Sequence, residues 1–442
     1  MSELLIHNVR IIPVIPRGTV YRGRAIYIQD GIIVEIDDEQ KLKRRHRSVE
    51  KLDGKNGILL PGFINAHTHI PEALIRGLCD DEPLEKWLFD YVWNYEKNLT
   101  SEKVYNGTFL GIIELIRNGV TSFIDQYFFA DSIARAVEKT GLRALICPSV
   151  FDNCPEGKTI ESQLKIAKNF VKNWKNKTSL IYTGLGPHAP YSVSKEHLED
   201  VFSFCKIENI PVHIHLSETL KEIKESKDKF KTTPIEYILN LMGQGSEPEA
   251  TCSRILAAHC VYPTDKEIKF MAKKNIHVLH CPESNLKLGS GIAPVPEYLE
   301  NNINVALGTD GTASNNNLNM LECMRITSFV QRAIFLDSTI MKKEILLEMA
   351  TYNGAKCLGL SSKLGSIEVG KFADLIIIDT NHVNMQPEHD ILSNIIYSAE
   401  PSNVRTVIVN GKIIMHDWKI ESFDEHKTLK KVYNDFKNVR SE

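Results

Sequence analysis

The middle of the chain alternates short apolar runs with helical stretches, and this alternation constrains the fold more than any other feature. Helical signals include a stretch that ends at Gly119, a start at Ser194 and a Thr264–Glu267 capping box. Nearly all-apolar strands that alternate with helices are typical of a parallel sheet covered by helices. Eight strand-like runs occur, at residues 63–69, 119–126, 143–150, 179–190, 210–218, 254–260, 276–282 and 303–311.

We therefore predict an α/β fold in which residues 61–360 form a closed (β/α)8 TIM barrel. A doubly wound open sheet is the structural alternative, and the chain has no GxGxxG loop that would support it.

The two ends of the chain share a different sequence pattern, made of short strand-like runs. Residues 3–60 contain strand-like pieces such as "GRAIYIQDGIIVEI", and residues 365–421 contain "VRTVIVNGKIIM". The pairs Asp30–Gly31 and Asn410–Gly411 are tight-turn signals between apolar runs. We predict one small β-sandwich domain built from residues 1–60 and 361–442.

Composition excludes several classes of protein. The net charge of −3, with 25% charged residues, gives no field that would favour nucleic acid or an anionic membrane. Nine cysteines without a CxxC pair indicate reduced thiols. No signal peptide and no apolar stretch near the ~18 residues of a membrane span are visible. We expect a cytoplasmic protein that binds neither nucleic acid nor a membrane. The composition does not decide whether the chain forms a homo-oligomer. The basic run 41–47 has acidic neighbours and is interpreted as a solvated loop.

Polar side chains gather where the predicted strands end. One histidine at a strand end is usually structural, but histidines here close five of the eight strands. The carboxyl ends of barrel strands form the active site. The residues concerned are His67 and His69, His188, His215 with Glu218, His259, His280 and Asp310.

Four of these residues suit a catalytic metal. Alternate residues of a strand share a face, so His67 and His69 can point at one ion. With His215 and Asp310 they supply three neutral ligands and one anion, and a position for water stays open. Zinc suits this set best, and Fe2+ or Mn2+ also fits. His213 shares the face of His215 one layer deeper and is interpreted as a buried structural residue.

Glu218 follows His215 by three positions, which strict alternation would place on the wrong face. It can act in the site only if the strand has ended by Leu216 or Ser217. There its carboxyl would serve as a general acid and base. A helix-capping role is the alternative.

These residues lie in stretches that carry a family resemblance: "PGFINAHTH", "HIHLSE", "AAHC", "HCPESNLKLGSGIAPV", "LGTDGTASNNNLNM" and "GSIEVGKFADLIIID". Over residues 3–415 the chain resembles the amidohydrolase superfamily, in the subgroup with one metal. It is most similar to the 5-methylthioadenosine/S-adenosylhomocysteine deaminases, with triazine hydrolases and guanine deaminases as near relatives.

The resemblance implies a hydrolytic deaminase that converts an adenosine-type nucleoside to the inosine-type product and ammonia. It implies metal ligation by His67, His69, His215 and Asp310. Glu218 would move a proton to the purine ring, and Asp310 would pass the proton of the attacking water to the leaving amine. It also implies that His259 orients that water, that Glu96 holds the ribose hydroxyls and that His188 contacts the nucleoside.

Some assignments stay open. Relatives that accept S-adenosylhomocysteine carry an arginine after the third strand, whereas this chain has "LICPSVFDN" there, which favours a smaller 5′ group. Ser284, Asn285 and Lys287 lie in a family motif without an assigned contact. The aromatic residues of segment 87–95 either pack a helix or line the pocket. The rival functions are hydrolysis of guanine or a substituted triazine, and a non-catalytic scaffold.

Overall fold

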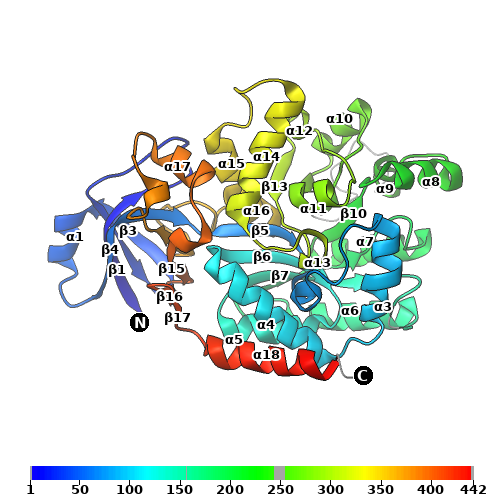
Figure 1. Ribbon diagram of the computed structural model, residues 1–442, viewed down its shortest axis with the longest axis horizontal. Helices are drawn as coiled ribbons and strands as arrows, with labels where there is room; N and C mark the ends of the chain where they lie inside the picture. The colour runs from blue at the N-terminus through cyan, green and yellow to red at the C-terminus, as the bar shows by residue number, and fades with distance from the viewer. Residues whose placement is uncertain (1, 156, 243–253, 440–442) are drawn as a thin grey trace.

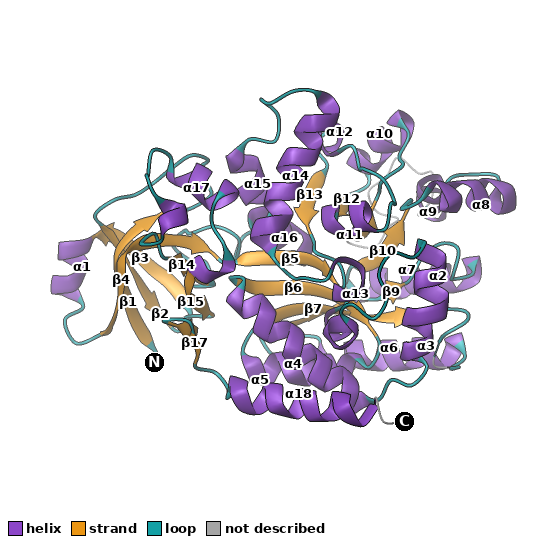
Figure 2. Ribbon diagram, in the orientation of Figure 1, coloured by secondary structure: helices purple, strands orange, loops and turns teal. Residues whose placement is uncertain are grey.

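The structure is a computed structural model that describes residues 2–155, 157–242 and 254–439. A sheet built from both ends of the chain lies beside a larger body in which helices surround parallel strands (Figures 1 and 2). Among the described residues, no helix combines the length and apolar character that crossing a membrane requires.

The terminal segments, predicted to form a small β-sandwich, combine into one eight-stranded sheet. Its order is β17-β16-β15-β14-β4-β1-β2-β3, and only the β1–β4 pair is parallel. All eight strands follow one hydrogen-bonded path, so the expected two-layered sandwich is not confirmed. The strands are β1 (Glu3–Ile11), β2 (Arg24–Gln29), β3 (Ile32–Asp38), β4 (Glu50–Pro61), β14 (Leu375–Ile378), β15 (Val404–Val409), β16 (Lys412–His416) and β17 (Lys419–Ile420).

Both predicted tight turns are present. Asp30 and Gly31 have φ of 49° and 82° between β2 and β3, and Asn410 and Gly411 have φ of 50° and 73° between β15 and β16. Two successive positive φ values match the twist of a two-residue hairpin, which explains the Asx-Gly pairs.

The predicted strands of the middle segment form two parallel sheets. One has the order β5-β6-β7-β8 and the other β10-β11-β12-β13. The fourth predicted run splits into two short pieces, β8 (Ile181–Thr183) and β9 (Gly186–Pro187). The other strands are β5 (Phe63–Thr68), β6 (Val120–Tyr127), β7 (Arg143–Val150), β10 (Val212–Leu216), β11 (Ile255–His259), β12 (Ile276–His280) and β13 (Asn304–Leu307).

The two parallel sheets contact each other at both margins. The Leu185 amide donates to the Pro211 carbonyl at 3.1 Å, and the Asp310 amide donates to the His67 carbonyl at 2.9 Å. Alternate side chains of β5, β6, β7, β11, β12 and β13 also pack in one buried cluster. No continuous ladder joins the sheets within the described residues, so the structure establishes a mixed α/β fold, and the closed barrel stays a prediction.

Helices cover the outside of these strands (Figure 2). The helix that begins after Ser194 and the Thr264–Glu267 capping box are confirmed. The longer helices are α4 (Ser101–Arg117), α5 (Ala130–Thr140), α6 (Ile160–Trp174), α7 (Lys195–Glu208), α8 (Leu220–Phe230), α9 (Pro234–Leu241), α10 (Asp265–Lys273), α14 (Met320–Phe335) and α18 (Glu425–Val439). Shorter ones are α11 (Pro282–Lys287), α12 (Val295–Glu300), α13 (Thr312–Asn315), α15 (Lys343–Met349), α16 (Tyr352–Leu358) and α17 (Ile391–Tyr397).

The basic run 41–47 is not a loop, in contrast to the prediction. It lies largely in α1 (Glu39–Arg45), where the Asp38 side chain accepts from the Lys41 amide and caps the helix. Leu42 is buried in a small cluster with Leu5 and Tyr27. The capping aspartate and the buried leucine favour a helix here. The prediction of a loop rested on the high charge of the run and gave no weight to these two residues.

A buried ion pair joins the terminal sheet to the parallel strands. The guanidinium of Arg143, at the start of β7, donates to both carboxylate oxygens of Asp374, at 2.8 and 3.0 Å, and both side chains are fully buried. The Asn410 amide adds a third hydrogen bond to Asp374 at 2.7 Å. Through Asp374, the β15–β16 turn of the terminal sheet is therefore linked to the parallel strands whose carboxyl ends carry the polar residues.

Candidate active site

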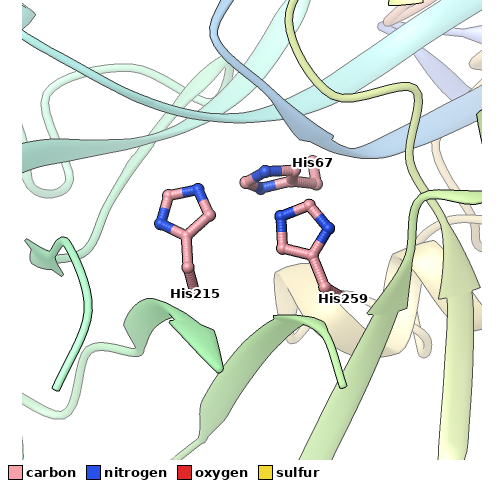
Figure 3. A group of neighbouring side chains, drawn as sticks. All are labelled: His67, His215 and His259. Carbon is pink, nitrogen blue, oxygen red and sulfur yellow. The ribbon is translucent and has the colours of Figure 1, made fainter. Parts of the chain in front are cut away.

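Four imidazoles and one carboxylate meet at the carboxyl ends of the parallel strands. His67 and His69 come from the end of β5, His215 from β10, and His259 from the last position of β11. Figure 3 shows His67, His215 and His259 turned toward one another. His67, His69 and Asp310 form a second overlapping group with ligand atoms in mutual reach. The structure thus brings together all four residues predicted to hold a metal.

Each imidazole is held from behind through its Nδ1 atom. His69 Nδ1 lies 2.6 Å from the Gln126 carbonyl oxygen, and His215 Nδ1 lies 2.8 Å from the carbonyl oxygen of His188. His259 Nδ1 lies 2.8 Å from Asn285 Oδ1. A carbonyl oxygen only accepts, so these Nδ1 atoms carry the hydrogen, and in the neutral ring the Nε2 lone pair is free. This arrangement fixes a histidine as a metal ligand.

The Nε2 atoms of these rings lie close to one another and to Asp310. Nε2 of His69 lies 3.2 Å from Nε2 of His215, and Oδ1 of Asp310 lies 3.3 Å from His67 Nε2 and 3.4 Å from His69 Nε2. Burial lowers the pKa of His67 to about 4 and that of His215 well below its usual value. Lone pairs of neutral rings repel one another at this distance. The donor set therefore fits a divalent cation that three imidazoles and a carboxylate would bind.

The backbone conformation that directs Asp310 into the site was not predicted from the sequence. The sequence placed Asp310 at the end of the strand-like run 303–311, but β13 already ends at Leu307. The Asp310 backbone is left-handed, with φ of 67°, an uncommon conformation that clusters at functional sites. Its Oδ2 accepts from the Ser284 hydroxyl at 2.6 Å. Although burial acts in the opposite direction, His67, His69 and His259 hold the pKa of Asp310 well below its usual value.

Glu218 faces the same cluster. The strand β10 ends at Leu216, and Ser217 has a left-handed φ of 52°, which turns the chain back toward the site. The strand therefore ends before Glu218, as a role of Glu218 in the site requires. Its Oε2 lies 3.7 Å from His259 Nε2, and its Oε1 accepts from the Ser290 hydroxyl at 2.9 Å. Burial lowers the pKa of His259, but Glu218 and Asp310 overcome that effect and raise it.

A pocket opens above the cluster, and both predicted nucleoside contacts line it. Glu96 is buried, and it accepts a hydrogen bond from the Tyr127 side chain. The His188 ring stacks on Phe151 at 4.4 Å between centroids. The other lining residues are His69, Glu72, Leu84, Trp87, Leu88, Val92, Trp93, Gln126, Phe128, Ser149, Tyr191, His215, Glu218, His259, Leu288, Asp310 and Ser314.

Some sequence candidates act elsewhere. His280 is buried at the end of β12 and does not line the pocket. Ser284 and Asn285 receive contacts that the sequence could not assign, since they hold Asp310 and His259 from behind. Lys287 pairs with Asp80 outside the pocket. Of the aromatic segment 87–95, Trp87 and Trp93 line the pocket.

Sequence reasoning missed several pocket residues. Gln126 holds His69 through its backbone carbonyl, which no side-chain pattern reveals. Glu72 lies three positions after His69 in the 3-10 helix Ile70–Ile75 and is 5% exposed. A lone carboxyl in an apolar segment was the available signal for Glu72.

Comparison with known proteins assigns the family. A model of the amidohydrolase family matches residues 58–414. The chain belongs to the amidohydrolase family. This amidohydrolase is 44% identical over 401 residues to a 5′-deoxyadenosine deaminase of Methanocaldococcus jannaschii, covering 90% of this chain and 93% of that relative. It is 40% identical to a 5-methylthioadenosine/S-adenosylhomocysteine deaminase of Syntrophomonas wolfei, with 97% of each chain covered.

A solved structure has the same fold as this amidohydrolase. An adenosine deaminase from Xanthomonas campestris with bound zinc superposes with a TM-score of 0.94 at 32% identity, covering 100% of this chain and 99% of that chain. The resemblance that the motifs predicted is thereby confirmed.

Proposed function

We propose that this amidohydrolase removes the 6-amino group of an adenosine-type nucleoside by hydrolysis, releasing ammonia. One observation carries the proposal: two carboxyl groups, Glu218 beside His259 and Asp310 beside His67 and His69, line a single pocket that also contains Glu96. Deamination moves protons at two places, the ring nitrogen and the leaving amine, and each needs a positioned acid or base. The names of the relatives support the same reaction.

The four ligand candidates would hold one divalent cation, and we propose zinc. His67, His69 and His215 offer neutral Nε2 atoms and Asp310 offers one carboxylate oxygen, a mixed set that zinc accepts. Zinc is bound in the adenosine deaminase with the same fold. A cation held in this way would act as a Lewis acid and would lower the pKa of a water molecule bound to it.

The side chains of the chain itself would carry the protons. Glu218, beside His259, donates a proton to ring nitrogen N1, which makes the neighbouring carbon C6 electrophilic. Asp310 accepts a proton of the attacking water, and the oxygen of that water bonds to C6. Asp310 then delivers the proton to the amine, which leaves as ammonia, and the new C6 hydroxyl returns a proton to Glu218. In its protonated form, which Glu218 and Asp310 favour, His259 keeps its Nδ1 hydrogen on Asn285, and its Nε2 donates a hydrogen bond to the same water and fixes the direction of attack. General acid and base groups placed in this way contribute about 10²–10⁴-fold to a rate.

The outer part of the pocket would hold the sugar. Glu96 is the buried carboxylate available to the two ribose hydroxyls, and His188 lies on the neighbouring wall against Phe151. A free base such as guanine has no ribose for Glu96 to hold, and a non-catalytic scaffold gives no reason for two carboxyls to line this pocket.

We propose a small, uncharged 5′ substituent, as in 5′-deoxyadenosine or methylthioadenosine. The pocket has apolar walls that include Leu84, Trp87, Leu88 and Phe151. No arginine or lysine of the described chain lines it. The amino-acid carboxylate of S-adenosylhomocysteine would therefore find no cation among these lining residues.

We also infer that the two parallel sheets form one (β/α)8 barrel over residues 61–360. The hydrogen bonds from Leu185 to Pro211 and from Asp310 to His67, together with the shared interior cluster, support this closure. The terminal segments 1–60 and 361–442 would then be the second domain.

An ammonia-release screen tests the function. The substrates are adenosine, 5′-deoxyadenosine, methylthioadenosine, S-adenosylhomocysteine, guanine and cytosine. We expect release from 5′-deoxyadenosine and methylthioadenosine, and much less from S-adenosylhomocysteine. Release from guanine alone would overturn the nucleoside assignment.

A further inference from the structure

A buried carboxyl without an assigned role lies in the wall of the pocket. Glu72 is 5% exposed, and its Oε2 atom is buried without a hydrogen-bond partner. It lines the same pocket as Glu96 and Asp310. An unpartnered buried carboxyl oxygen is costly, so packing alone does not explain a carboxyl in this wall of the pocket.

The backbone fixes the position of Glu72 closely. Its amide donates to the His69 carbonyl at 3.0 Å, which starts the turn after β5. A Cβ atom on Gly311 would lie 1.8 Å from Glu72 Oε2, so the carboxyl rests directly against the Gly311 backbone. Gly311 follows Asp310, and the carboxyl is therefore held next to the metal-ligand candidates on the β5 and β13 side.

Two other carboxyls line the same pocket as Glu72. They are Glu96 and Asp310, and the Glu72 carboxyl lies against Gly311, the residue after Asp310. Glu72 therefore lies beside the residue proposed at the reacting carbon, on the β5 and β13 side. Glu218 lies against His259 and Ser290, on the side of β10 and β11. The carboxyls of Glu72 and Glu218 thus approach the pocket from different sides of Asp310.

The shape of the adenine ring matches this arrangement. Its C6 carbon carries the amine, N1 lies on one side of C6, and the five-membered ring with N7 lies on the other. N7 shares that ring with N9, which bears the ribose. The edge that contains N7 therefore runs from the ribose to C6 on the side opposite N1. With C6 at Asp310, N1 at Glu218 and the ribose at Glu96, only this edge reaches Glu72.

We propose that Glu72 contacts the N7 edge of the adenine ring and determines which substituents the enzyme accepts there. The inference rests on the proposed function, because that function orients the ring in the pocket. It adds a specificity-determining residue at an edge for which the reaction itself requires no protein contact. A substituent on that edge would collide with the Glu72 side chain, which the Gly311 backbone prevents from moving aside.

A pair of substrate analogues tests the contact. The probes are 7-deaza-5′-deoxyadenosine and its 7-methyl derivative, which differ by one methyl group on the edge in question. Overpacking of a tight site typically costs 1–3 kcal/mol, so we expect the wild type to show a kcat/KM about tenfold or more lower for the methyl derivative. In Glu72→Ala the methyl group gains space, and we expect the two analogues to react within about threefold of each other.

Controls separate this outcome from general loosening of the pocket. Tyr191 lines the pocket and also a neighbouring hollow that contains Glu218, so Tyr191→Ala opens the N1 side. That variant should keep the wild-type discrimination, and so should Glu72→Gln, which preserves the shape of the side chain. If Glu72→Ala does not fold, as judged by circular dichroism, Glu72→Ser takes its place.

The inference would be overturned if the wild type accepts both analogues equally, or if Glu72→Ala rejects the methyl derivative as strongly as the wild type does. Either result, with 5′-deoxyadenosine still deaminated, leaves the proposed function intact. A wild type that releases ammonia from no adenosine-type nucleoside would instead refute the proposed function itself.

Discussion

Nδ1 of His67 lies 2.8 Å from Nε2 of His213, so a histidine on β10 holds the ligand candidate on β5 from behind. His213 is fully buried. The sequence placed it one layer below His215 and interpreted it as structural. This contact assigns His213 a positioning role, because the hydrogen bond sets the ring orientation of His67. In that orientation Nε2 of His67 is directed at Asp310.

We expect that His213→Phe weakens metal binding. Removal of such an outer partner typically costs 10–100-fold in metal affinity. Competition of the purified variant with a chelator of known affinity measures this change. His277→Phe is the matched control, because His277 is also buried but hydrogen-bonds Asn304 at the opposite end of its strand. Equal metal affinities for the wild type and His213→Phe would refute the positioning role.

Glu218→Gln should keep its metal and lose turnover. The amide preserves the contact with Ser290 but cannot transfer a proton, so we expect kcat to fall at least about a hundredfold. Metal content by elemental analysis and kcat by ammonia release are measured on the same sample. Glu225→Gln, which changes an exposed carboxyl paired with Lys221, should leave both values unchanged. Near-normal turnover of Glu218→Gln would rule out the proton transfer.

Glu96→Gln should affect only substrates with ribose hydroxyls. A charged partner makes a hydrogen bond worth about 1.5–3 kcal/mol, so we expect kcat/KM for 5′-deoxyadenosine to fall about tenfold or more. The same substitution should change kcat/KM little for the analogue that lacks both the 2′ and 3′ hydroxyls. An equal loss on both substrates would place Glu96 somewhere other than at the ribose.

Breaking the Arg143–Asp374 pair should destabilise the whole protein. Asp374→Asn leaves the Arg143 charge buried without its counter-ion, which typically costs about 3–5 kcal/mol. The midpoint of urea unfolding should therefore fall clearly. Asp200→Asn breaks the exposed pair with Lys168 and should cost less than about 1 kcal/mol. Similar midpoints for the two variants would show that the buried pair does not join the two parts of the fold.

Glu283 should make stability depend on pH. Burial, and then the charge of Glu322, raise its pKa from 4.5 to about 8 in the folded chain. Between these values the folded chain keeps a proton that the unfolded chain has released. The free energy of unfolding should therefore fall as pH rises through this range, by at most about 1.4 kcal/mol per pH unit.

Urea titrations at several pH values between 5 and 8 measure this slope. Glu283→Gln, which cannot ionise, should show a flatter dependence than the wild type. Identical slopes for the two proteins would contradict the raised pKa.

The sequence named the residues of the candidate site without showing how the backbone positions all of them. His67, His69 and His215 follow from strand parity, because β5 and β10 are regular to their ends. For Asp310 the expected direction came from the end of its strand, but β13 ends three residues earlier and a left-handed backbone supplies the direction instead. Such a conformation in a non-glycine residue follows from tertiary contacts, which no local pattern encodes.

The features that could not be predicted depend on the backbone. Gln126 acts through its carbonyl oxygen, and any residue could supply that atom. Glu72 reaches the pocket because Gly311 has no side chain, and the two residues are distant in sequence. The single hydrogen-bonded path of the terminal sheet also depends on long-range pairing, in particular the parallel contact of β1 with β4.

The metal content of purified protein tests the central claim, that His67, His69, His215 and Asp310 bind one shared cation. The wild type should hold about one equivalent of divalent metal per chain, and the folded double variant His69→Ala/His215→Ala should hold less than about 0.1 equivalent after zinc addition and dialysis. A folded double variant that keeps a full equivalent would contradict the claim.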